Sequence, residues 1–131
     1  MVGIARRKDK LKHWCETCEG ETSYYLADVS NRKNIKNIVL DIIDKEGEPD
    51  ILVNAAGINT REHADDVTLE GWDKTLDLNL STPFFMAQSV IEGMKKKNWG
   101  RIINYASLAS RRALPSSISY GASKGGIEQL T

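Results

Sequence analysis

The chain has 131 residues, 40% of them hydrophobic and 27% charged, and its 18 basic and 18 acidic side chains give no net charge at pH 7. These values are ordinary for one globular domain. The balanced charge disfavours a nucleic-acid or membrane-surface role. No apolar run approaches the roughly 20 residues that span a bilayer, and the basic residues that follow Met1–Ala5 exclude a secretory signal peptide. We therefore expect a cytoplasmic location.

Four short segments predict β-strands. They are apolar on successive residues and cover 2–5, 24–27, 51–53 and 102–103. Such runs are typical of strands covered on both faces, as in a parallel sheet between layers of helices.

The segments between these strands show the apolar pattern of helices. From Ile35, apolar residues recur at i, i+3, i+4 and i+7, and Gly47 ends the pattern. A second helix is predicted over residues 69–76, with Thr68 as its N-cap.

A third helix is predicted to begin at Pro83, with Ser81 and Thr82 before it as the cap. Strands and helices thus alternate along the chain. This alternation predicts an α/β fold with a doubly wound parallel sheet flanked by helices.

Ser107, Tyr120 and Lys124 form the most informative pattern. In a helix, Tyr120 and Lys124 are i and i+4 and lie on one face. An ammonium beside a phenol favours the phenolate, which can exchange a proton with an alcohol or a carbonyl. Ser107 directly follows a predicted strand, at the sheet edge where ligands bind in open α/β folds. Taken alone, the Tyr-x-x-x-Lys pair also fits an ordinary surface pair.

Small residues follow another strand end. Asn54, Ala55, Ala56 and Gly57 permit close approach of a ligand, and Asn54 can bridge neighbouring strand ends. In the sequence, the amide side chain of Asn79 stands between two leucine residues.

Together these residues resemble the short-chain dehydrogenase/reductase family, the Rossmann-type enzymes that use a nicotinamide cofactor. Residues 54–57 are similar to the family's Asn-Asn-Ala-Gly element, with Ala55 in place of the second asparagine. The family's catalytic tetrad is matched in order and spacing by Asn79, Ser107, Tyr120 and Lys124.

The resemblance implies an oxidoreductase that exchanges hydride between a nicotinamide and a secondary alcohol or ketone. Tyr120 would be the general acid/base, and Ser107 would hydrogen-bond the substrate oxygen. Lys124 would assist Tyr120 and hold the nicotinamide ribose. Asn79 would fix a water that relays protons to solvent.

The expected cofactor contacts begin with Arg6, which follows the first strand where this fold meets the adenosine ribose. An arginine there can pair with a 2′-phosphate, so we expect NADP, with NAD as the alternative. Asp28 and Val29 resemble the family's pair beside the adenine. The remaining expected contacts are Asn54, Ala55, Ala56, Gly57, Tyr120 and Lys124.

Cys15 and Cys18 form a Cys-x-x-Cys motif, which can be redox-active or half of a zinc site. A structural zinc needs four ligands, and the sequence offers no second cluster. We therefore interpret both thiols as packing residues and expect no metal.

The expected partner is a small alcohol or ketone. Residues 57–62 and 106–110 look most like gluconate 5-dehydrogenase and deoxygluconate dehydrogenase members. Arg61, Arg111 and Arg112 could pair with a substrate carboxylate. A 3-oxoacyl-carrier-protein reductase is the alternative, and the resemblance implies a homo-oligomeric full-length parent.

The match covers only the middle of a family member. The family opens with a strand and a glycine-rich turn that holds the cofactor pyrophosphate. We expect residues 1–131 to be a partial NAD(P)-binding Rossmann domain without that strand, that turn and the last strands. The strands ending at Ala5 and Val53 would then face a gap. A second hypothesis follows, in which the 131 residues alone are an unstable and inactive fragment of an active enzyme.

Overall fold

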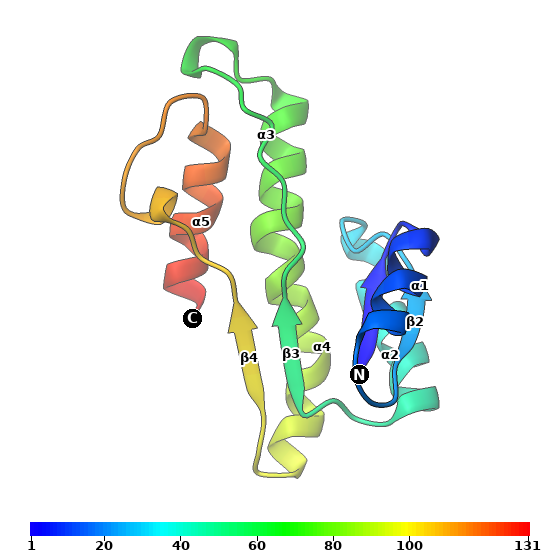
Figure 1. The fold of residues 1–131 in the computed structure, drawn as a ribbon. Coiled ribbons are helices and arrows are strands. Elements are labelled where there is room, and N and C mark those ends of the chain that lie inside the picture. The colour runs from blue at the N-terminus through cyan, green and yellow to red at the C-terminus, as the bar shows by residue number, and fades with distance from the viewer.

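Strands and helices alternate in the computed structural model, which describes all residues from 1 to 131 (Figure 1). This arrangement confirms the predicted α/β class. In chain order the elements are β1 (Val2–Ala5), α1 (Lys8–Thr17), β2 (Ser23–Leu26), α2 (Ile35–Glu46), β3 (Ile51–Asn54), α3 (Leu69–Leu76), α4 (Thr82–Lys96), β4 (Arg101–Asn104) and α5 (Ile118–Leu130).

The strands form two parallel pairs. β1 lies beside β2 with Val2 opposite Ser23, and β3 lies beside β4 with Ile51 opposite Arg101. β1 and β3 are not hydrogen-bonded to each other. The strands therefore form two separate two-stranded sheets.

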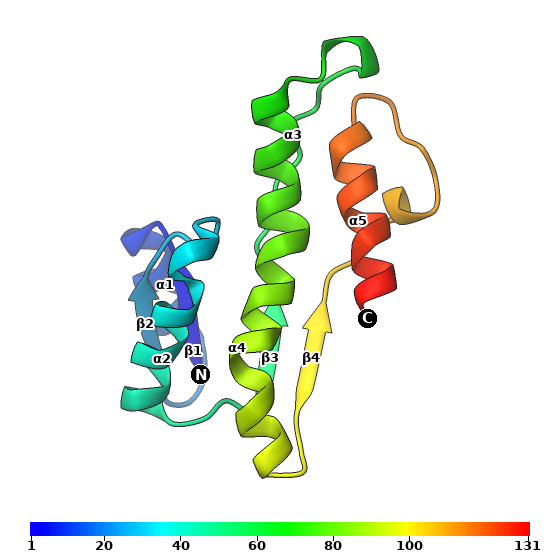
Figure 2. The same cartoon turned by 180° about the vertical axis from the view of Figure 1, so that it is seen from behind.

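One hydrophobic core holds the two sheets together. It forms between α2 and α4, which lie side by side on one face of the strands (Figure 2). Partly buried residues from β1, β3 and β4 pack against it, so the two helices bind both sheets into one layer. The buried members are Ile35, Val39, Met86, Val90 and Met94, and the strand residues are Ile4, Leu52 and Ile102.

The opposite face of the strands is covered unevenly. α1 packs on the β1–β2 pair, where a Cβ on Gly3 would lie 2.7 Å from the Trp14 ring, so the close approach requires glycine. On the β3–β4 pair, Ile51, Val53 and Ile103 are 52%, 49% and 47% exposed. These two strands therefore show one-sided burial in place of the two-sided burial expected from their sequence.

α3 and α4 are not two separate helices. They join through a π-helical turn at Asp77–Ser81 into one continuous rod (Figure 1). Ser81 has helical backbone angles and does not cap, and the Thr82 hydroxyl instead donates to the carbonyl of Val29 at 2.8 Å. The predicted helix start at Ser81 and Thr82 is therefore wrong. Pro83 is tolerated inside the rod because the adjoining π turn rearranges the backbone bonding.

Two other predicted helix ends are confirmed. The hydroxyl of Thr68 accepts a hydrogen bond from the Gly71 N–H at 3.0 Å and caps α3. α2 ends before Gly47, which has a positive φ of 86° that suits glycine. None of the helices combines the length and the apolar composition needed to cross a bilayer.

Candidate active site

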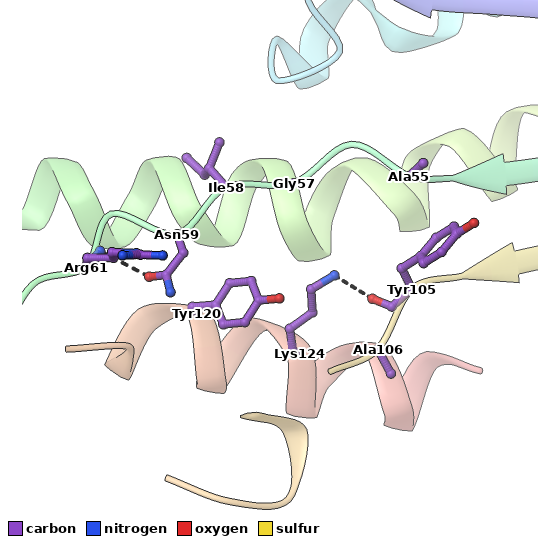
Figure 3. Close-up of a pocket in the computed structure, with 9 residues that line it drawn as sticks. All are labelled: Ala55, Gly57, Ile58, Asn59, Arg61, Tyr105, Ala106, Tyr120 and Lys124. Carbon is purple, nitrogen blue, oxygen red and sulfur yellow. Dashed lines mark hydrogen bonds between the residues drawn. The ribbon is translucent and has the colours of Figure 1, made fainter. Parts of the chain in front are cut away.

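An open pocket of about 530 Å³ lies beyond the carboxyl ends of β3 and β4 (Figure 3). It is formed by the loop after β3, the two residues after β4 and one face of α5. This is the sheet edge at which open α/β folds bind ligands. Its lining residues are Ala55, Gly57, Ile58, Asn59, Arg61, Tyr105, Ala106, Tyr120 and Lys124.

α5 places Tyr120 and Lys124 together. The helix runs from Ile118 to Leu130, so the two residues are one turn apart, and both line the pocket as their spacing predicted. The ammonium of Lys124 lies 5.8 Å from the centre of the Tyr120 ring. The Tyr120 hydroxyl makes no hydrogen bond within the chain, so it is available to a ligand.

Lys124 is a buried cation with unused donors. Its side chain is only 7% exposed, and its ammonium donates to the backbone carbonyl of Tyr105 (Figure 3). No carboxylate pairs with it. An ammonium has three N–H donors, and a buried charge is costly unless it is bonded. The remaining donors therefore favour a polar ligand in the pocket.

Ser107 lies just outside the pocket lining, after Ala106. Its hydroxyl accepts from the Ala109 N–H at 3.2 Å and caps the short 3₁₀ turn at Leu108–Ser110. The hydrogen of that hydroxyl has no acceptor within the chain, so Ser107 can still donate. The neighbouring Ser110 hydroxyl donates to the Lys124 carbonyl at 2.9 Å and ties this turn to α5.

Asn79 is buried in the π turn and does not line the pocket. Its side-chain oxygen accepts from the Ile58 N–H at 2.8 Å, and its amide nitrogen donates to the Ile58 carbonyl at 2.8 Å. The same nitrogen donates to the Ser123 hydroxyl at 3.1 Å. With both amide hydrogens engaged, the Asn79 side chain positions the pocket loop against α5.

The residues after β3 divide between two roles. Asn54 donates to the side-chain oxygen of Asn104 at 2.9 Å, which confirms that it bridges neighbouring strand ends. Ala55 and Gly57 line the pocket, whereas Asn54 and Ala56 do not. The small side chains of the lining pair leave the backbone open to a ligand.

Arg6 and Asp28 meet at the ends of β1 and β2, away from this pocket. The Arg6 guanidinium lies 3.7 Å from the Asp28 carboxylate. The side chain and backbone N–H of Ser30 both donate to Asp28, at 2.7 and 3.0 Å, and these bonds lower the pKa of Asp28. The carbonyl of Val29 is taken by Thr82, as described above.

Sequence reasoning missed two contributors to the pocket. Asn59 donates to the Ser117 hydroxyl at 3.0 Å and joins the loop after β3 to the start of α5. Tyr105 acts through its backbone carbonyl, which no side-chain pattern reveals. The position of Asn59 shortly after the Asn54–Gly57 segment is the signal that could have identified it.

Cys15 and Cys18 carry free, half-buried thiols at the end of α1. No group of three or more histidine, cysteine, aspartate or glutamate side chains comes together in a way that could hold a metal ion.

The family model described as short chain dehydrogenase matches residues 1–131, the whole chain. The chain belongs to the short-chain dehydrogenase family. The site described above is therefore the candidate active site of a short-chain dehydrogenase.

Two relatives are named for different substrates. The chain is 39% identical over 112 residues to a D-beta-hydroxybutyrate dehydrogenase of Rhizobium meliloti, covering 86% of this chain and 43% of that one. It is 40% identical over 104 residues to an NAD-dependent glycerol dehydrogenase of Listeria innocua, covering 79% and 41%. The chain thus spans less than half the length of these two dehydrogenases.

A solved structure confirms the fold. A metagenomic short-chain oxidoreductase in complex with NADP superposes with a TM-score of 0.90 at 27% identity, covering 98% of this chain and 60% of that one. The parallel strands and flanking helices are thus those of the short-chain dehydrogenase Rossmann fold.

Proposed function

We propose that the protein containing this chain is a nicotinamide-dependent oxidoreductase that interconverts a secondary alcohol and a ketone. The observation that carries the proposal is the pairing of Tyr120 and Lys124 one turn apart in the pocket. The Tyr120 hydroxyl and part of the Lys124 ammonium have no partner within the chain.

The pocket residues fit such a cofactor. Three of the lining residues, Ala55, Gly57 and Ala106, have a small side chain or none, so a flat ring and its ribose can approach the backbone closely. The buried Lys124 ammonium offers donors for ribose hydroxyls. When bound, the oxidised nicotinamide accepts a hydride from the carbinol carbon.

Tyr120 is the general acid/base of the proposed reaction. In the oxidation direction, its phenolate oxygen accepts the proton of the substrate hydroxyl, and in reduction it returns the proton to the carbonyl oxygen. The alcohol thus loses one hydride and one proton and becomes a ketone. The Lys124 ammonium lies 5.8 Å from the centre of the Tyr120 ring, and Ser107 donates its free hydroxyl hydrogen to the substrate oxygen. Asn79 keeps the pocket loop in place during the reaction.

For the cofactor we propose NADP. Arg6 is exposed at the end of β1, and its bond to Asp28 is long at 3.7 Å, so it can turn to a 2′-phosphate. Asp28 and Val29, at the end of the adjacent strand, would lie beside the adenine. Titration with NADPH and NADH separates the two cofactors, because tighter binding of NADPH that is lost in Arg6→Gln supports this choice.

For the substrate we propose a gluconate-type sugar acid. Arg61 lines the pocket and can pair with the carboxylate of a small acid. Turnover of gluconate-type acids without turnover of acetoacetyl thioesters supports the proposal. The reverse result favours a 3-oxoacyl-carrier-protein reductase.

The reaction is tested on the gene product that contains residues 1–131. Reduction of NADP or NAD by a panel of secondary alcohols is followed by absorbance, together with cofactor binding to Lys124→Met. We expect turnover in the parent and weakened cofactor binding in the variant, relative to Lys95→Met on the exposed end of α4. Absence of turnover with every alcohol and ketone of the panel would refute the proposal.

A further inference from the structure

Arg61 is a solvent-exposed cation that lines the pocket and has no partner within the chain. It lines the pocket with Tyr120 and Lys124, and its guanidinium makes no hydrogen bond and no ion pair within the chain. The lining contains two cations, Arg61 and Lys124, and no carboxylate. The pocket therefore presents positive charge to whatever enters it.

Lys124 and Arg61 differ in their partners and in their positions around the Tyr120 ring. Its ammonium is already bonded to the carbonyl of Tyr105 and lies beside the Tyr120 ring. In Figure 3, Arg61 and Asn59 lie on one side of that ring and Lys124 on the other. The Tyr120 hydroxyl points toward Lys124 in that view, so a substrate whose oxygen reaches the hydroxyl must pass over the Tyr120 ring to reach Arg61.

The loop that carries Arg61 is held in a defined conformation. The Arg61 N–H donates to the Asn59 side chain at 3.0 Å, and Asn59 in turn donates to Ser117 at 3.0 Å. Arg61 has a φ of 57°, in the left-handed region that costs energy for a residue with a Cβ. Non-glycine residues held in this region are concentrated at ligand sites.

The acidic residue that follows Arg61 in the sequence, Glu62, has other partners. The Glu62 carboxylate accepts from the hydroxyls of Thr68 and Thr60 at 2.7 and 2.8 Å, and these bonds lower the pKa of Glu62. Glu62 is thus ionised at neutral pH but bonded away from the guanidinium. Arg61 keeps its charge free for a ligand.

The structure distinguishes Arg61 from the other two candidate arginines. Arg111 lies 3.2 Å from the Glu128 carboxylate, and neither Arg111 nor Arg112 lines the pocket. We propose that Arg61 binds an anionic group of the substrate, which makes this site selective for hydroxy and oxo acids over neutral alcohols. The proposal rests on the proposed function and adds the residue that selects the substrate class.

The test uses pairs of substrates that differ in the acid group. Gluconate is compared with sorbitol, and 3-hydroxybutyrate with 2-butanol, in the gene product that contains this chain. In Arg61→Gln we expect the KM of the accepted acid to rise about 10- to 100-fold, the range for a lost hydrogen bond to a charged group, with kcat little changed. Arg61→Lys should retain part of the binding, and Arg112→Gln should match the parent.

Each outcome has a definite meaning. Equal turnover of acid and neutral alcohol in the parent, or an unchanged KM for the acid in Arg61→Gln, overturns the role of Arg61 and leaves the oxidoreductase proposal intact. A rise in the KM of the cofactor alone also overturns it, since Arg61 would then contact the cofactor. Absence of all turnover instead refutes the proposed function. If Arg61→Gln does not fold, competitive inhibition of neutral-alcohol turnover by butyrate in the parent decides the question, because butanol of equal size should not inhibit.

Discussion

Asn79 and Ile58 exchange two hydrogen bonds of 2.8 Å across 21 positions of sequence. The amide of Asn79 bonds both backbone groups of Ile58, much as a neighbouring strand does. Ile58 lines the pocket, whereas Asn79 is buried behind it. One side chain therefore fixes the pocket loop without touching its contents.

Replacement of Asn79 by alanine should destabilise the fold. It leaves the N–H and C=O of Ile58 without partners, at a cost of about 1–3 kcal/mol for each buried group. We expect a loss of about 2–4 kcal/mol in the free energy of unfolding, measured with urea. Asn37→Ala on the exposed face of α2 is the control and should change it by less than about 0.5 kcal/mol. Equal stability of the two variants would contradict the role given to Asn79.

Replacement of Tyr120 by phenylalanine should abolish proton transfer and preserve the fold. The hydroxyl has no partner within the chain, so its removal leaves no buried group unsatisfied. We expect kcat/KM of the gene product to fall by about 10²–10⁴-fold with an unchanged melting temperature. Tyr24→Phe in β2 is the matched control. Full activity in Tyr120→Phe would show that another group moves the proton.

The carboxylate of Asp28 should stabilise the protein only above acidic pH. The Ser30 hydroxyl and N–H bond the ionised form and hold the pKa of Asp28 below its ordinary value. A group with a lowered folded-state pKa contributes stability above its unfolded pKa, about 3.9, and loses it as the pH falls through the folded value. Asp28→Asn should therefore lower the melting temperature at pH 7 and lower it less near pH 3, where the pH is already below the unfolded pKa and the stabilisation has begun to be lost. Asp44→Asn on α2, which lacks such hydrogen bonds, should show no comparable change, and an equal effect of Asp28→Asn at both pH values would contradict the prediction.

Residues 1–131 expressed alone should self-associate. Ile51, Val53 and Ile103 form an exposed apolar face on β3 and β4, and β1 and β3 each have an unpaired edge. We expect multimers by light scattering, and Ile103→Lys should reduce them. Leu69→Lys, at a position that is 84% exposed and outside this face, should not. Monomeric behaviour of the unmodified chain would contradict the prediction.

The order of the elements and the central pair of the site could be predicted from the sequence. Apolar runs mark the strands, and the four-residue spacing of Tyr120 and Lys124 places them on one face of a helix, as the structure has them. Both signals are local, because they depend only on the period of the backbone. The role of Asn54 as a bridge between strand ends was also predicted, whereas its partner Asn104 is known only from the structure.

The remaining features depend on distant contacts or on the backbone. Pro83 reads as a helix start, because proline favours the first turn, yet it lies inside a rod whose π turn has no simple sequence signature. The partner of Asn79 lies 21 positions away, and Tyr105 contributes a carbonyl that every residue possesses. Selection of Arg61 over Arg111 and Arg112 required knowledge of which loop borders the pocket.

The π turn at Asp77–Ser81 also sets the rotation of α4 about the helix axis relative to α3. Each residue of an α-helix advances the helical face by about 100°, so the wider turn rotates α4 relative to α3. The rod faces α5 through α3 and α2 through α4. Deleting one residue from the turn would restore a uniform helix and turn one of these faces away from its partner. The core and the pocket could then not form at the same time.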